Sequence, residues 1–259
     1  MVKLKNSALV LKYFGLLLTF FILISCSQQK NFVTKIEGKK IGITETQAEN
    51  PDIEKFIQPY RENIDKDLNQ VLAYNPENLE KSKGEWQTNI GNFLADITFN
   101  KSNKVFQSRE NKSIDICILN HGGIRTMIPK GNVTARNAFE VMPFENAAVV
   151  VVLKGSQIIE MVNYIINEKK PHPLKGLTFT IDKNNTAKNI LVQNKAVDNT
   201  TIYYVVTSDY LANGGDNMIF FKQGVERFDI DYKLRNIMID YFKEVDTLSY
   251  DNSTRITKE

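Results

Sequence analysis

The run Ala147–Leu153 is continuously apolar, and most of its side chains are branched at Cβ. A strand with one solvent-exposed face alternates apolar and polar residues, whereas a strand that is covered on both faces is apolar throughout. Beyond Lys154, apolar residues recur at helical spacing, which predicts a helix over residues 155–168. A chain with such a strand must cover a sheet on both sides.

Other patterns along the chain complete a mixed fold. Shorter apolar runs predict further strands, and helical spacing predicts further helices. The predicted strands are 114–119, 177–181 and 202–207. One predicted helix begins at Asp52, a second begins near Asn89, and a third covers 230–244. Gly38 predicts a hairpin within residues 35–46. With 259 residues, no repeat and no Pro/Gly-rich linker, the chain predicts one α+β domain over residues 35–259.

The N-terminal segment is typical of an exported protein. Basic residues precede an apolar run over residues 13–24, which is too short to span a bilayer and suits a signal peptide. The run ends at Leu23-Ile24-Ser25-Cys26, which resembles the lipobox of bacterial lipoproteins. This predicts a signal peptide over 1–25, a lipidated Cys26, a polar tether over 26–34, and anchoring to the cell envelope, at the outer membrane. The alternative is an uncleaved signal anchor with an incidental cysteine.

The scarce cysteines and histidines limit the possible chemistry. If Cys26 carries lipid, Cys117 has no internal disulfide partner, and its strand-like surroundings predict a core position. The two histidines are His121 and His172, and neither lies among the Asp, His and Asn residues that a two-metal site requires. We expect His172, which lies between two prolines, in an exposed loop. The chain therefore predicts no metal site and no cofactor of its own.

Three segments place polar or aromatic residues at the ends of predicted strands. Residues 120–125 (Asn-His-Gly-Gly-Ile-Arg) combine an amide, two glycines that permit close approach of a ligand, and a forked cation. In residues 141–146 (Val-Met-Pro-Phe-Glu-Asn), the proline stiffens the backbone that presents Phe144. Residues 209–216 (Asp-Tyr-Leu-Ala-Asn-Gly-Gly-Asp) place Tyr210 before a Gly-Gly turn and Asp216 after it. Each segment alone could be an ordinary turn or core element.

Together these groups suit a nucleoside. A base stacks between rings, its edge needs an amide, its sugar needs an acceptor and its phosphate needs a cation. The net charge is only +3, which gives the whole protein no attraction for nucleic acid, so anion binding must be local.

Segments 118–125, 142–144 and 210–216 resemble, in order and spacing, the C-terminal domain of bacterial 5′-nucleotidases, UDP-sugar hydrolases and animal ecto-5′-nucleotidases. Residues 88–96 are similar to the segment that opens a helix in that family. The resemblance covers about residues 35–258. It implies an α+β fold, arranged as a layered α/β/β/α sandwich with mixed sheets.

The resemblance also implies a role for each matching residue. The base would lie between the rings of Phe144 and Tyr210, where the family more usually has phenylalanine at the second position. The other matching positions are Asn120, Gly122 and Asn146 for the base, Asp216 for the ribose and Arg125 for the phosphate.

Besides Tyr210, two features of this chain depart from the family pattern. His121 replaces a small residue of the turn, so it would narrow the pocket or reach the ligand. An arginine that family members often carry upstream of Asn89 is missing. Phosphate binding would then be weaker, or Lys81 or Lys83 would supply the second positive charge.

The resemblance implies half of a hydrolase. Full-length relatives cut phosphate esters with two metal ions in an N-terminal metallophosphatase domain, and divalent metals are therefore expected only in a partner. The leading hypothesis is a nucleotide-binding half that acts with a separately encoded metallophosphatase in nucleotide salvage. The alternatives are a surface lipoprotein that binds nucleosides or nucleotides without catalysis, and a degenerate structural relic.

Overall fold

The computed structural model describes residues 7–23, 32–44 and 47–259, and the chain divides into two units, Met1–Pro51 and Asp52–Glu259. In the first unit, helix α1 covers Ser7–Leu23, and residues 32–44 form no strand and are exposed. The hairpin predicted within 35–46 is therefore wrong over the described residues. Cys26 and the two residues before it in the lipobox lie outside the described ranges. Among the described residues, no helix combines the length and apolar character needed to cross a bilayer.

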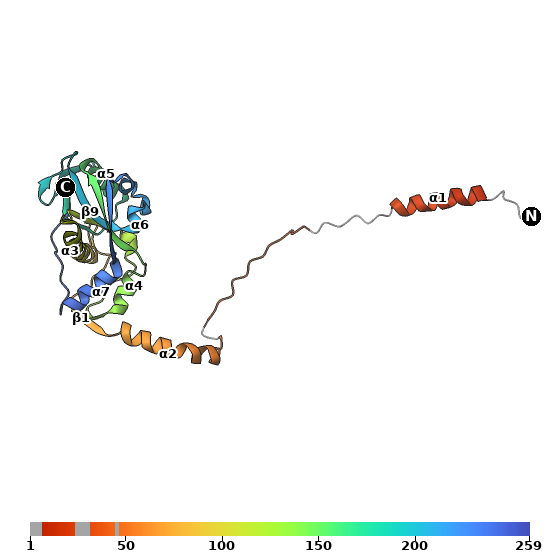
Figure 1. The fold of residues 1–259 in the computed structure, drawn as a ribbon, viewed down its shortest axis with the longest axis horizontal. Coiled ribbons are helices and arrows are strands. Elements are labelled where there is room, and N and C mark those ends of the chain that lie inside the picture. Colours follow the sequence, from red (N-terminus) through yellow and green to blue (C-terminus); the bar gives the residue numbers. More distant parts are fainter. Residues whose placement is uncertain (1–6, 24–31, 45–46) are drawn as a thin grey trace, which may run out of the picture. The chain divides into compact units, whose positions relative to one another are not determined.

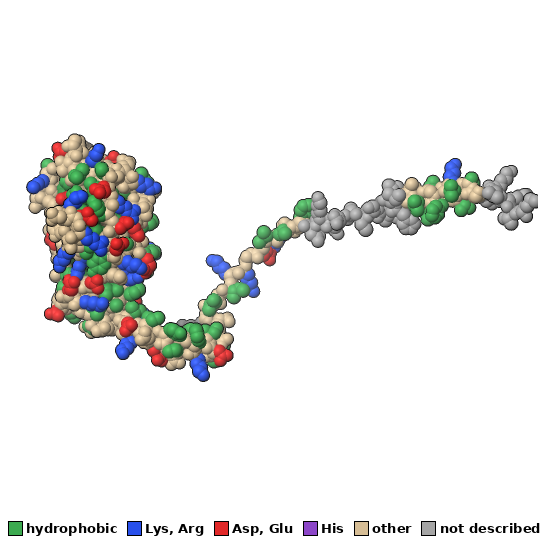
Figure 2. Space-filling view, viewed as in Figure 1, with side chains coloured by type: hydrophobic (Ala, Val, Ile, Leu, Met, Phe, Trp, Pro, Cys, Tyr) green, Lys and Arg blue, Asp and Glu red, His purple; other side chains and the backbone are tan. Residues whose placement is uncertain are grey.

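The second unit begins at the second residue of helix α2, which covers Pro51–Leu68. The helix begins where the sequence predicts, with a proline in the first turn and acidic residues beside it. Its apolar side chains gather along one side of the helix and are exposed (Figure 2): Ile53, Phe56, Tyr60 and Ile64. Another side contacts the rest of the unit, where Arg136 binds Asp65 and Asn69.

Mixed strands and helices make up the rest of the unit (Figure 1). The strands are β1 (Val71–Asn75), β2 (Ile116–Ile118), β3 (Gly131–Thr134), β4 (Ala147–Lys154), β5 (Leu174–Lys175), β6 (Leu177–Ile181), β7 (Ala187–Val192), β8 (Lys195–Ala196), β9 (Ile202–Ser208), β10 (Glu226–Lys233) and β11 (Ile256–Lys258). The helices are α3 (Asn89–Glu110), α4 (Ala135–Val141), α5 (Gly155–Glu168), α6 (Asp209–Ala212) and α7 (Leu234–Glu244), with short 3₁₀ turns at His121–Gly123, Gly215–Asn217 and Ile219–Gln223.

The central sheet has five strands in the order β10-β4-β9-β2-β5. Strand β9 is antiparallel to β4 and parallel to β2, so the sheet is mixed. A second sheet has the order β11-β6-β7-β8, and β1 and β3 form a separate antiparallel pair.

Strand β4 is covered on both faces, as its apolar run predicts. Ala148 and Val150 belong to a core with α3 and α7, whereas Val149, Val151 and Leu153 belong to a second core with α5 and strand β6. Each of the two cores is closed by helices. The second core also includes residues of the four-stranded sheet. The observed fold is therefore the mixed α/β arrangement that the sequence predicts.

The helix predicted over 230–244 is wrong in its first part. Residues up to Lys233 belong to strand β10, and the helix begins only at Leu234. Phe228, Ile230 and Tyr232 alternate with exposed residues, which is the period of a strand, and β10 pairs with the buried β4. Pairing with a central strand therefore decides the structure of this segment.

A buried ion pair ties the C-terminal segment to α3. The Nη2 of Arg255 lies 2.7 Å from Oδ1 of Asp96, and both side chains are buried. Lys175 lies 3.3 Å from the same Asp96 oxygen and 3.1 Å from Asp251. These contacts fix the segment that precedes β11, and β11 itself pairs in parallel with β6.

Candidate functional site

All seven site residues predicted from the sequence line one cavity of about 350 Å³. They come from three loops: the turn after β2, the segment between α4 and β4, and the segment from α6 to the following 3₁₀ turn. The complete lining is Asn120, Gly122, Gly123, Arg125, Phe144, Asn146, Tyr210 and Asp216. The volume is in the range of small-molecule pockets.

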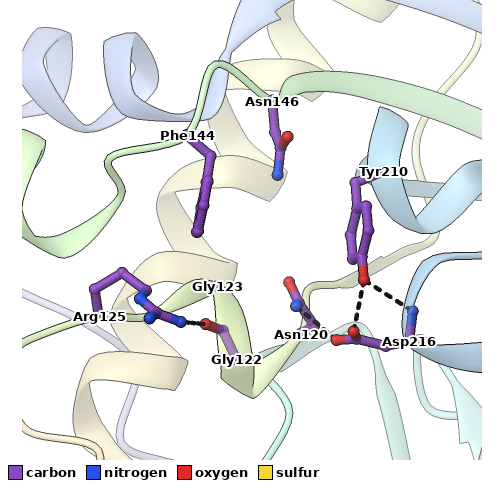
Figure 3. A pocket seen from close by; sticks show the side chains of 8 residues that line it. All are labelled: Asn120, Gly122, Gly123, Arg125, Phe144, Asn146, Tyr210 and Asp216. Carbon is purple, nitrogen blue, oxygen red and sulfur yellow. Dashed lines mark hydrogen bonds between the residues drawn. The ribbon is translucent and has the colours of Figure 1, made fainter. Parts of the chain in front are cut away.

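Two aromatic rings stand on opposite sides of this cavity (Figure 3). Phe144 and Tyr210 are 47% and 44% exposed, so both keep ring surface free for a ligand. Asn146 lies between them at one edge, while Asn120 and Asp216 lie close to the Tyr210 hydroxyl at the other (Figure 3). A flat ring with polar edges is the shape that this arrangement accommodates.

The Asn120 side chain folds over the turn after β2. A Cβ on Gly123 would lie 2.8 Å from Oδ1 of Asn120, so a larger residue at this position would displace that side chain. Asn120 Nδ2 also donates to Asp216 Oδ2 at 2.7 Å. At the end of the turn, the Arg125 N–H donates to the carbonyl of Val141 at 2.9 Å.

Arg125 lies on the Phe144 side of the cavity. Its guanidinium carbon is 5.7 Å from the centre of the Phe144 ring, and its Nη1 donates to the Gly122 carbonyl at 3.2 Å. The cation therefore borders the cavity and can meet an anionic group of a ligand.

A buried arginine fixes the segment that carries Phe144. Arg235, on α7, is only 6% exposed, and its Nη1 donates to the carbonyls of Pro143 and Phe144 at 3.2 and 3.4 Å. Its Nη2 binds Glu145, which also pairs with Lys233. Hydrogen bonds from these two cations hold the pKa of Glu145 at about 2, so this carboxylate stays charged and bound.

Tyr210 is held by its own hydroxyl. The hydroxyl donates to Asp216 Oδ1 at 2.8 Å and accepts from the Asp216 N–H at 3.2 Å. Gly215 lies against one side of the ring, because a Cβ there would come within 2.5 Å of ring carbons. Ser208 caps the short helix that carries the tyrosine, accepting from the Leu211 N–H.

A layer behind the cavity contains His172, which the sequence predicts to be exposed. That prediction is wrong, since His172 is only 3% exposed. Its Nδ1 accepts from the His121 N–H at 3.3 Å, and its ring lies 5.7 Å from that of Tyr164. Tyr164 in turn donates to the Asp216 carbonyl at 2.7 Å. Burial lowers the pKa of His172 to about 4, so the imidazole is neutral and can accept.

His121 and the two candidate lysines have different positions. The His121 side chain is not among those that line the cavity, and burial lowers its pKa. Lys81 Nζ donates to the Ile124 carbonyl at 2.7 Å, next to Arg125. Lys83 is exposed and pairs with Glu80 at 2.7 Å. Neither lysine lines the cavity, and Lys81 is the one that contacts the segment carrying Arg125.

The cavity offers groups that bind and orient. Among the residues described, no group of three or more His, Cys, Asp or Glu residues could hold a metal ion. Cys117 lies in strand β2 and is buried in the first core, and burial raises the pKa of its thiol, as expected for a core residue.

Three supporting residues were not predicted from the sequence: Arg235, Tyr164 and His172. Each acts on the backbone of a loop far away in sequence, as with the 92 positions between Arg235 and Pro143. A tyrosine at helical spacing and an arginine in a helix are common on surfaces, so local patterns carry no signal for these roles. For His172, the flanking prolines suggested a loop but could not show what covers it.

Comparison with known proteins identifies the family. The family model described as "5'-nucleotidase, C-terminal domain" matches residues 70–223. The trifunctional nucleotide phosphoesterase protein YfkN of Bacillus subtilis is 26% identical over 222 residues, which cover 79% of this chain and 15% of that protein. The 5'-nucleotidase of Vibrio vulnificus is 24% identical over 191 residues, 70% of this chain and 32% of its own length.

Solved structures give the same result. The 5'-nucleotidase precursor of Thermus thermophilus has a TM-score of 0.67 and 26% identity, and the match covers 79% of this chain and 42% of that one. The NAD nucleotidase of Haemophilus influenzae has a TM-score of 0.62 at 17% identity over 81% of this chain and 42% of that one, which shows a shared fold. The chain spans less than half the length of the curated relatives it matches.

Proposed function

Because the chain belongs to the family of 5′-nucleotidase C-terminal domains, we propose that its cavity binds the nucleoside part of a nucleotide. We further propose that it forms the nucleotide-binding half of a 5′-nucleotidase-type phosphohydrolase. The observation that carries this proposal is the cavity itself, in which seven residues from three distant loops meet between two half-exposed rings.

In this proposal each side of the cavity meets one part of the ligand. The base stacks between Phe144 and Tyr210, where each stack contributes about 1–3 kcal/mol. The amides of Asn120 and Asn146 meet the edge of the base, and Asp216 accepts hydrogen bonds from the ribose. The phosphate extends toward Arg125.

The hydrolytic step belongs, in this proposal, to a separate metallophosphatase polypeptide, which would bind the divalent metals. The curated relatives are more than twice as long as the matched segment, which supports a larger functional assembly. A lipid on Cys26 would hold this chain on the outer membrane. A partner anchored on the same membrane would then meet it at high effective concentration.

Reconstitution tests the split enzyme. The purified chain without residues 1–25 is mixed with a stand-alone metallophosphatase domain from the same host, and release of phosphate from AMP is measured. We expect activity from the mixture that neither part shows alone and that EDTA abolishes. Chelator-resistant hydrolysis by this chain alone, or a mixture no more active than its parts, would contradict the proposal.

Capture of a nucleoside without hydrolysis is the second candidate, and the chemistry of the lining favours it. The carboxylate of Asp216 is hydrogen-bonded through both oxygens, and the other polar groups around it are amides, a phenol and a guanidinium. Such groups orient a ligand. Calorimetry that detects adenosine binding, together with failed reconstitution, would select this second candidate.

A further inference from the structure

Asp216 is held from several directions at once. Its Oδ1 accepts from the Tyr210 hydroxyl at 2.8 Å, and its Oδ2 accepts from Asn120 at 2.7 Å. Its backbone N–H donates to the same Tyr210 hydroxyl at 3.2 Å, and its carbonyl accepts from Tyr164 at 2.7 Å. Four hydrogen bonds therefore fix a residue that lies at the surface of the cavity.

The backbone of Asp216 needs this support. Its φ and ψ are 51° and 28°, in the left-handed region that residues other than glycine seldom adopt. Such a conformation persists when neighbouring groups determine it, and it is concentrated at ligand sites. The Tyr210 hydroxyl supplies two of the four bonds, one to the side chain and one to the backbone.

We infer that the Tyr210 hydroxyl positions Asp216 so that its carboxylate reads the vicinal diol of a ribose. This inference rests on the proposed nucleoside ligand. An ionised carboxylate offers about four lone-pair directions. Tyr210 and Asn120 each occupy one, on different oxygens, which leaves one on each oxygen for the two hydroxyls of a diol.

The same residue therefore links two kinds of recognition. The Tyr210 ring faces the cavity, and its hydroxyl determines where the sugar acceptor stands (Figure 3). The hydrogen bond to Asp216 raises the pKa of Tyr210, so the hydroxyl remains a donor throughout the neutral range. A phenylalanine would keep the ring and lose both bonds to Asp216.

Calorimetry with a matched pair of ligands tests the inference. Adenosine carries the diol, and 2′,3′-dideoxyadenosine has the same base without it. Each is titrated into the wild-type chain, Tyr210→Phe, Asp216→Asn and the double variant. Asparagine tolerates the left-handed conformation, so Asp216→Asn changes the charge and not the backbone. Thermal unfolding of each protein shows that it is folded.

We expect Tyr210→Phe to weaken adenosine binding about tenfold and dideoxyadenosine binding less than twofold. Asp216→Asn should remove the same preference, and the double variant should lose little more than either single variant. Equal losses for both ligands, or tighter binding of adenosine to Tyr210→Phe, would overturn the inference and leave the proposed function intact. A wild-type chain that binds neither adenosine nor AMP would overturn both. If Tyr210→Phe does not fold, a preference for adenosine that survives in Asp216→Asn overturns the inference.

Discussion

The two rings of the cavity are supported in different ways. On the Phe144 side, a buried guanidinium from another helix holds the backbone of the loop, and the ring itself makes none of these bonds. On the Tyr210 side, the ring's own hydroxyl makes the bonds that fix the neighbouring loop. One side is therefore supported from behind, whereas the other is supported by a group that belongs to the cavity.

On the Phe144 side, the residues that stabilise the loop differ from the ring that contacts the ligand, whereas on the Tyr210 side one residue does both. A change in the Phe144 ring should affect the ligand and leave the loop in place. A change in Tyr210 should affect the ring, the loop and Asp216 together. The two sides also face different parts of the proposed ligand, since Arg125 stands beside Phe144 and Asp216 beside Tyr210.

Removing Arg235 should have the largest effect. Arg235→Met keeps the apolar stem and removes the bonds to two carbonyls and the stacking on the Phe139 ring, which lies 4.1 Å from the guanidinium carbon. We expect the free energy of unfolding to fall by about 3 kcal/mol, measured by urea denaturation. Lys233→Met removes the exposed cation on Glu145 and is the matched control, expected to change stability little. Equal effects of the two variants would show that Arg235 contributes no more to stability than an exposed ion pair does.

The two ring deletions should differ from each other. Tyr210→Ala removes a stacking surface and the support of Asp216, so we expect adenosine affinity to fall about a hundredfold. Phe144→Ala removes a stacking surface alone and should cost about tenfold. Calorimetry measures both, and thermal unfolding should show Phe144→Ala close to wild type because its ring is half exposed. Equal losses of affinity would remove the distinction between the two sides.

Lowering the pH should destabilise the buried layer that contains His172 and Tyr164. Burial lowers the pKa of His172 to about 4, against about 6.5 in an unfolded chain. Below pH 6.5 the His172 imidazole binds a proton in the unfolded chain but not in the folded one. The free energy of unfolding therefore falls as the pH decreases toward 4. We expect the free energy of unfolding to drop by about 2 kcal/mol between pH 7 and pH 5.

His172→Phe, followed by urea denaturation at several pH values, checks this window. The variant should show a much flatter dependence, although the lowered pKa of His121 acts in the same direction. His121→Asn is therefore the control, and the slope should depend more on His172. A slope that neither variant changes would place the titrating group elsewhere.

The smallest expected effect concerns the phosphate, on the Phe144 side. Lys81→Met removes a positive charge next to Arg125 and should weaken AMP binding about threefold while leaving adenosine binding unchanged. Lys83→Met should change neither, because that lysine is exposed and paired with Glu80. If the two lysine variants behave alike, Lys81 has no special part in phosphate binding.

The sequence predicted most of the fold because its strongest signals are local. The apolar run of β4 can be satisfied only by cover on both faces, and strands β6 and β9 and helix α5 fall at or near their predicted residues. Strand β10 was missed although Phe228, Ile230 and Tyr232 alternate with charged residues, because helical spacing follows directly after it and its pairing with β4 is a tertiary contact. The hairpin prediction was wrong because Gly38 indicates a possible turn, but a glycine alone does not show that the segments on either side of it pair as strands.

The positions of the site residues were predictable for a different reason. Phe144 directly follows Pro143, and Asn120 and Tyr210 lie two and four residues before a glycine pair, so the local sequence marks all three segments as turns. Their support was not predictable, since Arg235, Tyr164 and His172 act through loop backbone far away in sequence. Local sequence likewise could not show that Lys81, and not Lys83, contacts the Ile124 carbonyl, because this contact depends on how the segment before α3 packs against residues 120–125.

The ion pair between Asp96 and Arg255 has a consequence for how the Asp52–Glu259 unit folds. The two residues are separated by 159 positions, so their contact closes a long stretch of the chain. A carboxylate buried without its partner is strongly unfavourable. Helix α3 therefore takes its final buried place only when the segment around Arg255 has also docked. We expect the Asp52–Glu259 unit to complete its folding as one late event and not segment by segment.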